Sequence, residues 1–75
     1  MTETLNVRLR RAEGALVRLL GLTERRGYPA TQVSAIPLDG TTMLVQLTVR
    51  CERPLEQLTR QLAKLYDVTH VEKTP

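Results

Sequence analysis

The chain has 75 residues, 41% of them hydrophobic and 25% charged, with one cysteine and a formal net charge of +3. This size predicts a single domain, residues 1–75, whose core is small enough that a partner chain is the expected reinforcement. The lone cysteine excludes an internal disulfide and a cysteine-built metal cage, and the modest charge indicates a solvated, arginine-rich surface.

The N-terminal third predicts a strand followed by a helix. Apolar and polar residues alternate over residues 5–10, as in a strand with one buried face. A short loop is predicted over residues 11–14, with Gly14 at or just inside the start of a helix. Counted from Ala12, apolar residues recur at helical spacing and form one stripe: Ala12, Ala15, Leu16, Leu19, Leu20 and Leu22. Arg25 and Arg26 favour the C-terminal end of this helix, and Gly27 suits the left-handed residue that follows such an end.

Two strands joined by a turn are predicted next. Residues 31–38 predict a strand, in which Pro37 indicates an edge position or a strand end because proline cannot donate to a ladder. The pair Asp39-Gly40 signals a hairpin turn. Apolar residues then alternate over residues 43–50, and this is the clearest strand of the chain.

The C-terminal third predicts a second helix and a last strand. Pro54 suits the first turn of a helix. Leucines follow at spacings of three and four, on one narrow face: Leu55, Leu58, Leu62 and Leu65. Glu56 and Arg60 are spaced to pair on the outer side, and residues 68–73 predict a short strand.

The predicted elements alternate as strand, helix, strand, strand, helix, strand. Two right-handed crossovers around a central hairpin build an α+β, ferredoxin-like βαββαβ sandwich, in which a four-stranded antiparallel sheet carries both helices on one face. The other face has no cover within the chain. If it carries apolar residues such as Ile36 and Leu44, we expect it to meet a partner.

The sequence offers little for catalysis or nucleic-acid binding. His70 is the single histidine, and no phosphate loop, metal-ligand spacing or paired-carboxylate motif is present. RNA-recognition domains share this element order, but they stack bases on strand aromatics, and Tyr28 and Tyr66 lie outside the predicted strands. Without an apolar run of signal-peptide or membrane length, the expectation is a cytoplasmic protein with a reduced Cys51 and no membrane or nucleic-acid partner.

The loop before the first helix is the remaining candidate site. A helix start presents free backbone N–H groups and the positive end of the helix dipole, which suits a small carboxylate such as that of an amino acid. Gly14 lacks a side chain, so a ligand could approach the backbone there. The alternative is an ordinary strand-to-helix turn in which glycine serves the backbone alone, and the residues by themselves favour this alternative.

Two separated segments resemble one known family. The segment E-G-A-L-V-R-L-L-G-L-T-E-R-R-G-Y, residues 13–28, resembles the ACT-domain signature of acetolactate synthase small regulatory subunits, in which a glycine opens the first helix. The segment L-E-Q-L-T-R-Q-L-A-K-L-Y-D-V-T-H-V, residues 55–71, resembles that family's second helix and last strand. The resemblance covers residues 5–71, and a chain ending at Pro75 resembles the short, isozyme II-like type with a single ACT domain.

The resemblance implies a non-catalytic regulatory subunit. Such a subunit binds and activates the large subunit of acetolactate synthase in branched-chain amino-acid biosynthesis, and in some members it confers feedback inhibition by valine. Thiamine diphosphate, Mg²⁺ and FAD would belong to the large subunit, so no cofactor is expected in this chain. A stand-alone ACT sensor, which binds an amino acid and acts on another partner, is the alternative.

The resemblance also implies a homodimer with a small amino-acid effector at its interface. Side-by-side pairing would bring the first loop of one copy to the second strand of the other, with these candidate residues: Arg11, Glu13, Gly14, Ala15, Leu16, Pro29, Val33 and Ser34. Valine-sensitive members carry asparagines where this chain has Arg11 and Pro29, so weak or absent valine binding is expected, with Arg11 meeting a carboxylate by charge instead. The candidate contacts to the large subunit are Val17, Arg18 and Arg25.

Overall fold

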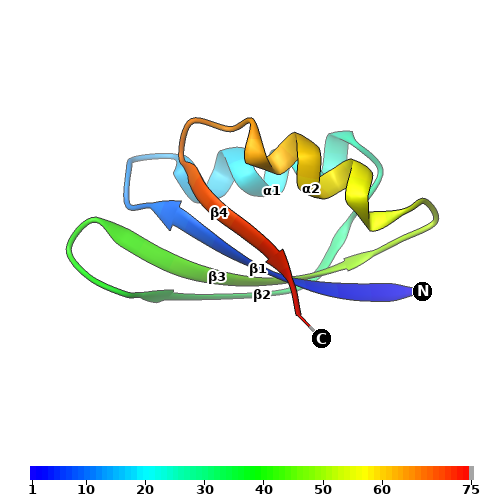
Figure 1. The fold of residues 1–75 in the computed structure, drawn as a ribbon, viewed down its shortest axis with the longest axis horizontal. Coiled ribbons are helices and arrows are strands. Elements are labelled where there is room, and N and C mark those ends of the chain that lie inside the picture. The colour runs from blue at the N-terminus through cyan, green and yellow to red at the C-terminus, as the bar shows by residue number, and fades with distance from the viewer. Residues whose placement is uncertain (75) are drawn as a thin grey trace.

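The computed structural model describes residues 1–74, so the last residue of the predicted domain, Pro75, lies outside the described residues. Six elements follow one another (Figure 1): β1 (Thr2–Arg10), α1 (Ala15–Arg25), β2 (Ala30–Pro37), β3 (Thr42–Arg50), α2 (Leu55–Ala63) and β4 (Val68–Lys73). The strands form one antiparallel sheet in the order β2-β3-β1-β4. The predicted βαββαβ order and the ferredoxin-like fold are confirmed.

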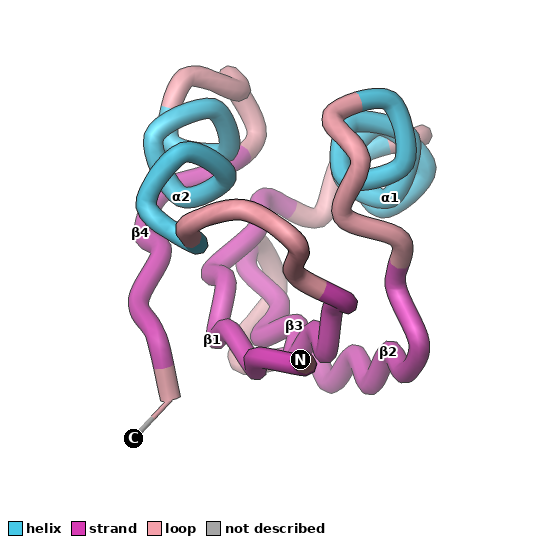
Figure 2. Tube along the Cα trace, turned by 90° about the vertical axis from the view of Figure 1, so that its right-hand side faces the viewer, coloured by secondary structure: helices cyan, strands magenta, loops and turns pink. Residues whose placement is uncertain are grey.

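Both helices lie on the same face of the sheet (Figure 2). α1 lies on the β2 side of the sheet and α2 on the β4 side. Because successive side chains of a strand point to opposite faces, the alternating apolar residues of the two central strands all meet the helices. They are fully buried: Leu5, Val7 and Leu9 from β1, and Val45, Leu47 and Val49 from β3. Leu19 of α1 and Leu58 and Leu62 of α2 close this core from above.

The predicted loop over residues 11–14 is confirmed, and only the first residue of the apolar stripe, Ala12, lies outside the helix. Ala12 is exposed and lies in the loop, and the helix starts at Ala15 because Gly14, its N-cap, is left-handed with φ +77°. Thr23, which the stripe did not include, is fully buried, and its hydroxyl donates to the carbonyl of Leu20 at 2.8 Å. That internal bond lets a polar side chain enter the core without leaving a donor unsatisfied.

The end of α1 is closed as the sequence predicted. Gly27 is left-handed with φ +84°, and its N–H donates to the carbonyl of Glu24 at 3.1 Å. The N–H of Tyr28 donates to the carbonyl of Thr23 at 2.8 Å, which completes a Schellman motif. The motif turns the chain sharply toward β2.

The hairpin between β2 and β3 is built around Asp39. One carboxylate oxygen of Asp39 accepts the N–H groups of both Thr41 and Thr42 at 2.8 Å. These hydrogen bonds hold the pKa of Asp39 below its ordinary value of 3.8. The turn predicted from Asp39-Gly40 is therefore present, but it spans residues 38–41 and Gly40 is not left-handed. Pro37 ends β2, which is an edge strand, as predicted.

The second helix differs from its prediction at both ends. Pro54 is the N-cap residue rather than a member of the first turn, and Leu65 lies beyond the last helical residue and is only partly buried. Among the ion pairs of residues 1–74, none joins Glu56 to Arg60. Across the same residues, neither helix has the length and apolarity needed to cross a membrane.

The uncovered face of the sheet is mostly neutral and polar. Ile36 and Leu44 are cross-strand partners on it, with Ile36 53% exposed, and the same row continues through Arg8 to His70. The neighbouring rows carry polar side chains: Thr4, Asn6, Gln32, Ser34, Gln46, Thr48 and Glu72. The apolar pair expected on this face is present, and its partner stays a prediction.

Candidate functional site

The loop between β1 and α1 is held against the β2–β3 turn. The N–H of Arg11 donates to the carbonyl of Thr41 at 2.8 Å, and the Arg11 guanidinium donates to the carbonyl of Asp39 at 2.9 Å. The Arg11 charge also adds to the lowering of the Asp39 pKa, after the hydrogen bonds from Thr41 and Thr42. The Arg11 side chain, which was predicted to bind an effector carboxylate, therefore makes a hydrogen bond to the β2–β3 turn.

Gly14 serves the backbone of this loop. Its φ of +77° lies in the left-handed region, where a side chain is strained. A Cβ at this position would also lie 2.8 Å from Nη1 of Arg18. The space left by the missing side chain is therefore occupied by Arg18, and the structure favours the ordinary-turn interpretation of this glycine over an opening for a ligand.

Arg18 ties the start of α1 to the start of β4. Its Nε donates to Oδ2 of Asp67 at 2.8 Å, and its Nη2 lies 2.7 Å from the same oxygen. Nη2 also donates to the carbonyl of Glu13 at 3.1 Å. The Asp67 side chain is only 9% exposed, and a carboxylate in that setting needs a charged partner. Arg18 thus clamps the loop from within the chain, and because its side chain is 51% exposed, its predicted contact with the large subunit stays a prediction.

The first turn of α1 keeps free hydrogen-bond donors. The N–H of Ala15 donates to the carbonyl of Ala12 at 3.1 Å, and the N–H of Arg18 donates to the carbonyl of Gly14 at 2.9 Å. Leu16 and Val17 have no acceptor for their N–H groups among the residues that the structure describes. These two donors and the positive end of the helix dipole can hold a carboxylate.

One chain brings only part of the predicted effector site together. Residues 11–16 gather at the N-terminal end of α1, although the Ala15 side chain is 3% exposed and belongs to the core. Pro29 follows the other end of this 11-residue helix, about 16 Å away by helical rise. Val33 pairs with Leu47 on the helix side of the sheet, whereas Ser34 faces the opposite side. A second chain would have to supply the β2 residues.

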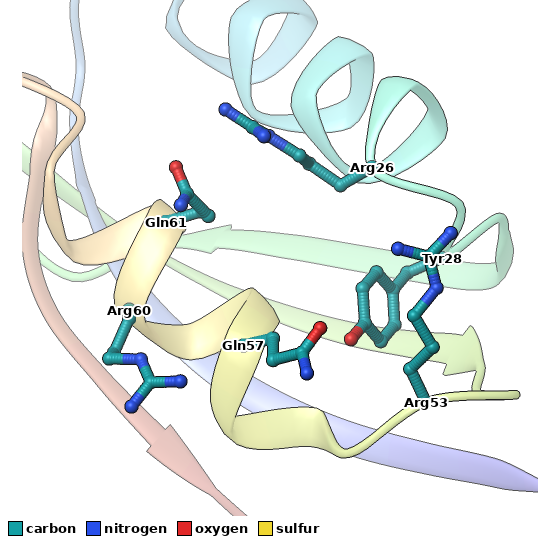
Figure 3. A pocket seen from close by; sticks show the side chains of 6 residues that line it. All are labelled: Arg26, Tyr28, Arg53, Gln57, Arg60 and Gln61. Atoms are coloured by element: carbon teal, nitrogen blue, oxygen red, sulfur yellow. The ribbon is translucent and has the colours of Figure 1, made fainter.

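A hollow that sequence reasoning missed lies between the C-terminal end of α1 and α2 (Figure 3). Its volume is about 280 Å³, and its lining residues come from both helices and the segments beside them: Arg26, Tyr28, Arg53, Gln57, Arg60 and Gln61. Sequence patterns place Arg26 at a helix end and pair Arg60 with Glu56, and they give no role to Arg53. No local spacing connects them, because the chain brings them together only by folding.

Comparisons with known proteins agree on one family. A family model for the ACT domain matches residues 11–71. The small subunit of acetolactate synthase isozyme 3 from Escherichia coli K12 is 42% identical over 74 residues, which cover 95% of this chain and 45% of that protein. The acetolactate synthase small subunit of Buchnera aphidicola is 37% identical, over 97% of this chain and 48% of that protein. The chain thus spans less than half the length of these relatives.

Solved structures show the same fold. The small subunit of acetolactate synthase from Thermotoga maritima superposes with a TM-score of 0.85 at 17% identity, over 97% of this chain and 47% of that one. The ACT domain of GTP pyrophosphokinase from Chlorobium tepidum superposes with a TM-score of 0.82 at 14% identity, over 99% of this chain and 97% of that one.

Proposed function

Because the chain belongs to the ACT-domain family, we propose that it is a non-catalytic regulatory subunit that binds and activates the large subunit of acetolactate synthase in branched-chain amino-acid biosynthesis. The identity to acetolactate synthase small subunits over nearly the whole chain is the observation that carries this proposal. Catalysis, with its thiamine diphosphate, Mg²⁺ and FAD, belongs to the large subunit, and this chain holds no cofactor of its own.

A homodimer completes the effector site in this proposal. The β2 edge is open along its length, with Val33 40% and Ile36 53% exposed. An open edge with apolar side chains is a ready surface for a second chain. Side-by-side pairing through β2 would bring Val33 of one copy toward the Leu16 and Val17 donors of the other, with the carboxylate of a small amino acid between them.

Valine feedback is weak or absent in this proposal. The Arg11 guanidinium donates one hydrogen bond to the carbonyl of Asp39, and as a donor-only cation it cannot supply the acceptor oxygen of a neutral amide. Pro29 has no N–H, and its carbonyl already accepts the N–H of Arg50 at 2.9 Å. Neither residue offers the hydrogen-bonding amide that the family's valine site uses. The residues proposed to contact the large subunit are all exposed, with Val17 74% exposed, so the three remain candidates: Val17, Arg18 and Arg25.

The test measures acetolactate formation by the purified large subunit of the same organism, with and without this chain. A several-fold rise is expected, followed by little change when valine, leucine or isoleucine is added at concentrations on the order of millimolar. Serum albumin at equal mass is the control for non-specific stabilisation. No rise, together with separate migration of the two proteins on a sizing column, would contradict the proposal and favour a stand-alone amino-acid sensor.

A further inference from the structure

The hollow between the end of α1 and α2 is rich in positive charge. Figure 3 shows Arg26 extending from the end of α1 toward Gln61 of α2, while Arg53 stands beside the ring of Tyr28. Arg60 stands on α2, one turn beyond Gln57. Among residues 1–74, no acidic residue lines this hollow. Arg26, Arg53 and Arg60 line it together with neutral groups only, and the space is called the arginine hollow below.

The charges of the arginine hollow are not neutralised within the chain. Among residues 1–74, the ion pairs join Arg18 to Asp67, His70 to Glu72, and Lys73 to Glu3, and none includes a residue of the hollow. The side chains of Arg26, Arg53 and Arg60 also make no hydrogen bond within this part of the chain. Like charges around one space repel, so an anion that enters it relieves that repulsion.

Buried contacts beneath the hollow hold its walls in place. Tyr28 is 2% exposed, and its hydroxyl donates to the carbonyl of Pro54 at 2.8 Å, which ties the end of α1 to the start of α2. A Cβ at Gly27 would lie 3.0 Å from Nη2 of Arg53, so the left-handed glycine also leaves room for that guanidinium. The backbone positions of Arg26 and Arg53 are thus set before any ligand arrives.

The chemistry of the walls fits a phosphate group. Each guanidinium carries five N–H donors in a planar fork, and Gln57 and Gln61 add carboxamide donors. A carboxylate carries a single negative charge, whereas a terminal phosphate has three oxygens and a charge near −2 at neutral pH, so phosphate gains more from a space lined by several guanidinium groups. The hollow is concave, so a compact group can enter it, whereas a flat protein surface would not fill it.

We propose that the arginine hollow binds the phosphate group of a small phosphorylated molecule. This site is separate from the loop between β1 and α1, residues 11–14, which is called the effector loop below. The two sites lie at opposite ends of α1, so one can be filled without the other. The proposal does not depend on the regulatory role proposed above. Because all three arginines are exposed, binding is salt-sensitive.

The experiment is an NMR titration of the full ¹⁵N-labelled chain with inorganic phosphate at low ionic strength, against chloride at matched ionic strength. Saturable shifts are expected at the amides of residues 26–28 and 53–61. The double variant Arg26→Gln/Arg53→Gln should lower phosphate affinity by about tenfold or more, since it removes two charge-assisted contacts. The matched control Arg8→Gln/Arg50→Gln removes the same charge from strand residues outside the hollow and should change affinity by less than about twofold.

Three results would overturn the proposal. The first is the absence of saturable shifts around the hollow. The second is an equal loss of affinity in both double variants, which would indicate attraction to net charge alone. The third is an Arg26→Gln/Arg53→Gln variant that keeps the phosphate affinity of the wild type but no longer activates the large subunit, which would make the arginines a protein contact. Retained ¹⁵N dispersion in each variant shows that the fold is intact.

Discussion

At the residue scale, Gly14 shows how one position can serve the fold where a ligand was expected. Its left-handed backbone turns the chain from β1 into α1, and Arg18 occupies the space beside it on the way to Asp67. A side chain at Gly14 would strain the backbone and crowd Nη1 of Arg18, whose Nε and Nη2 hold the nearly buried Asp67 carboxylate. The glycine therefore serves the turn and also leaves room for the guanidinium.

We expect Gly14→Ala to lower the free energy of unfolding by about 1–2 kcal/mol, the cost of left-handed backbone for a residue with a Cβ. Urea denaturation followed by circular dichroism measures this change. The control is Gly40→Ala, since Gly40 is not left-handed and has no heavy atom within 4 Å of a Cβ built there. The control should stay within about 0.5 kcal/mol of wild type. Equal losses in the two variants would show that the left-handed backbone and Arg18 are not the cause.

At the element scale, the β2–β3 hairpin depends on one ionised side chain. Asp39 accepts two backbone N–H groups, and the Arg11 guanidinium binds its carbonyl, so the turn also anchors the effector loop. The pKa of Asp39 is lowered in the folded chain. Protonation of Asp39 should therefore loosen the hairpin that anchors the loop between β1 and α1.

The sign of this pH effect follows from the lowered pKa. Stability from Asp39 is present above its ordinary pKa of 3.8 and is lost as the pH falls through the lower folded-state value. Hydrogen-exchange protection at Thr41 and Thr42 should fall as the pH is lowered from about 5 to about 2. Asp39→Asn keeps an acceptor oxygen that does not titrate, so it should remove this local pH dependence. Unchanged acid loosening in Asp39→Asn would assign the effect to another carboxyl group.

At the scale of the whole molecule, the two edges of the sheet differ. β2 is exposed along nearly its whole length and carries apolar side chains, whereas the exposed side chains of β4 are polar: Thr69, His70, Glu72 and Lys73. An apolar open edge on a chain this small is a surface that a second copy can cover. The proposed dimer uses β2 for this reason, and the effector site depends on it.

The proposed dimer can be tested with two separate variants, each of which places one lysine on one edge strand of the sheet. Sedimentation at about 100 μM should give a dimeric mass for the wild type and a largely monomeric one for Val33→Lys, because the lysine charge would have to be buried in the interface. Thr69→Lys places the same charge on β4 and should leave the dimer intact. A monomeric wild type, or equal dissociation of both variants, would contradict pairing through β2.

Much of this fold could be predicted from the sequence, because local patterns carry it. Alternation over residues 5–10 and 43–50, and leucines spaced by three and four after Pro54, report which side of each element is buried. The left-handed Gly14 ends the predicted loop and sets the start of α1 at Ala15, whereas both ends of α2 differ from their prediction. Six elements and their order follow from rules that act within a few residues of each position.

The candidate site could be predicted only in part. The sequence by itself determined that a loop ending in Gly14 precedes a helix with free N-terminal donors. Only the tertiary structure decided that Arg18 reaches Asp67, 49 residues away, and that Arg11 reaches Asp39, 28 residues away. It alone brought together the arginine hollow and separated Ser34 from the effector loop. Spacing along the chain reports the face on which a side chain lies, whereas its partner is set by how separate elements pack.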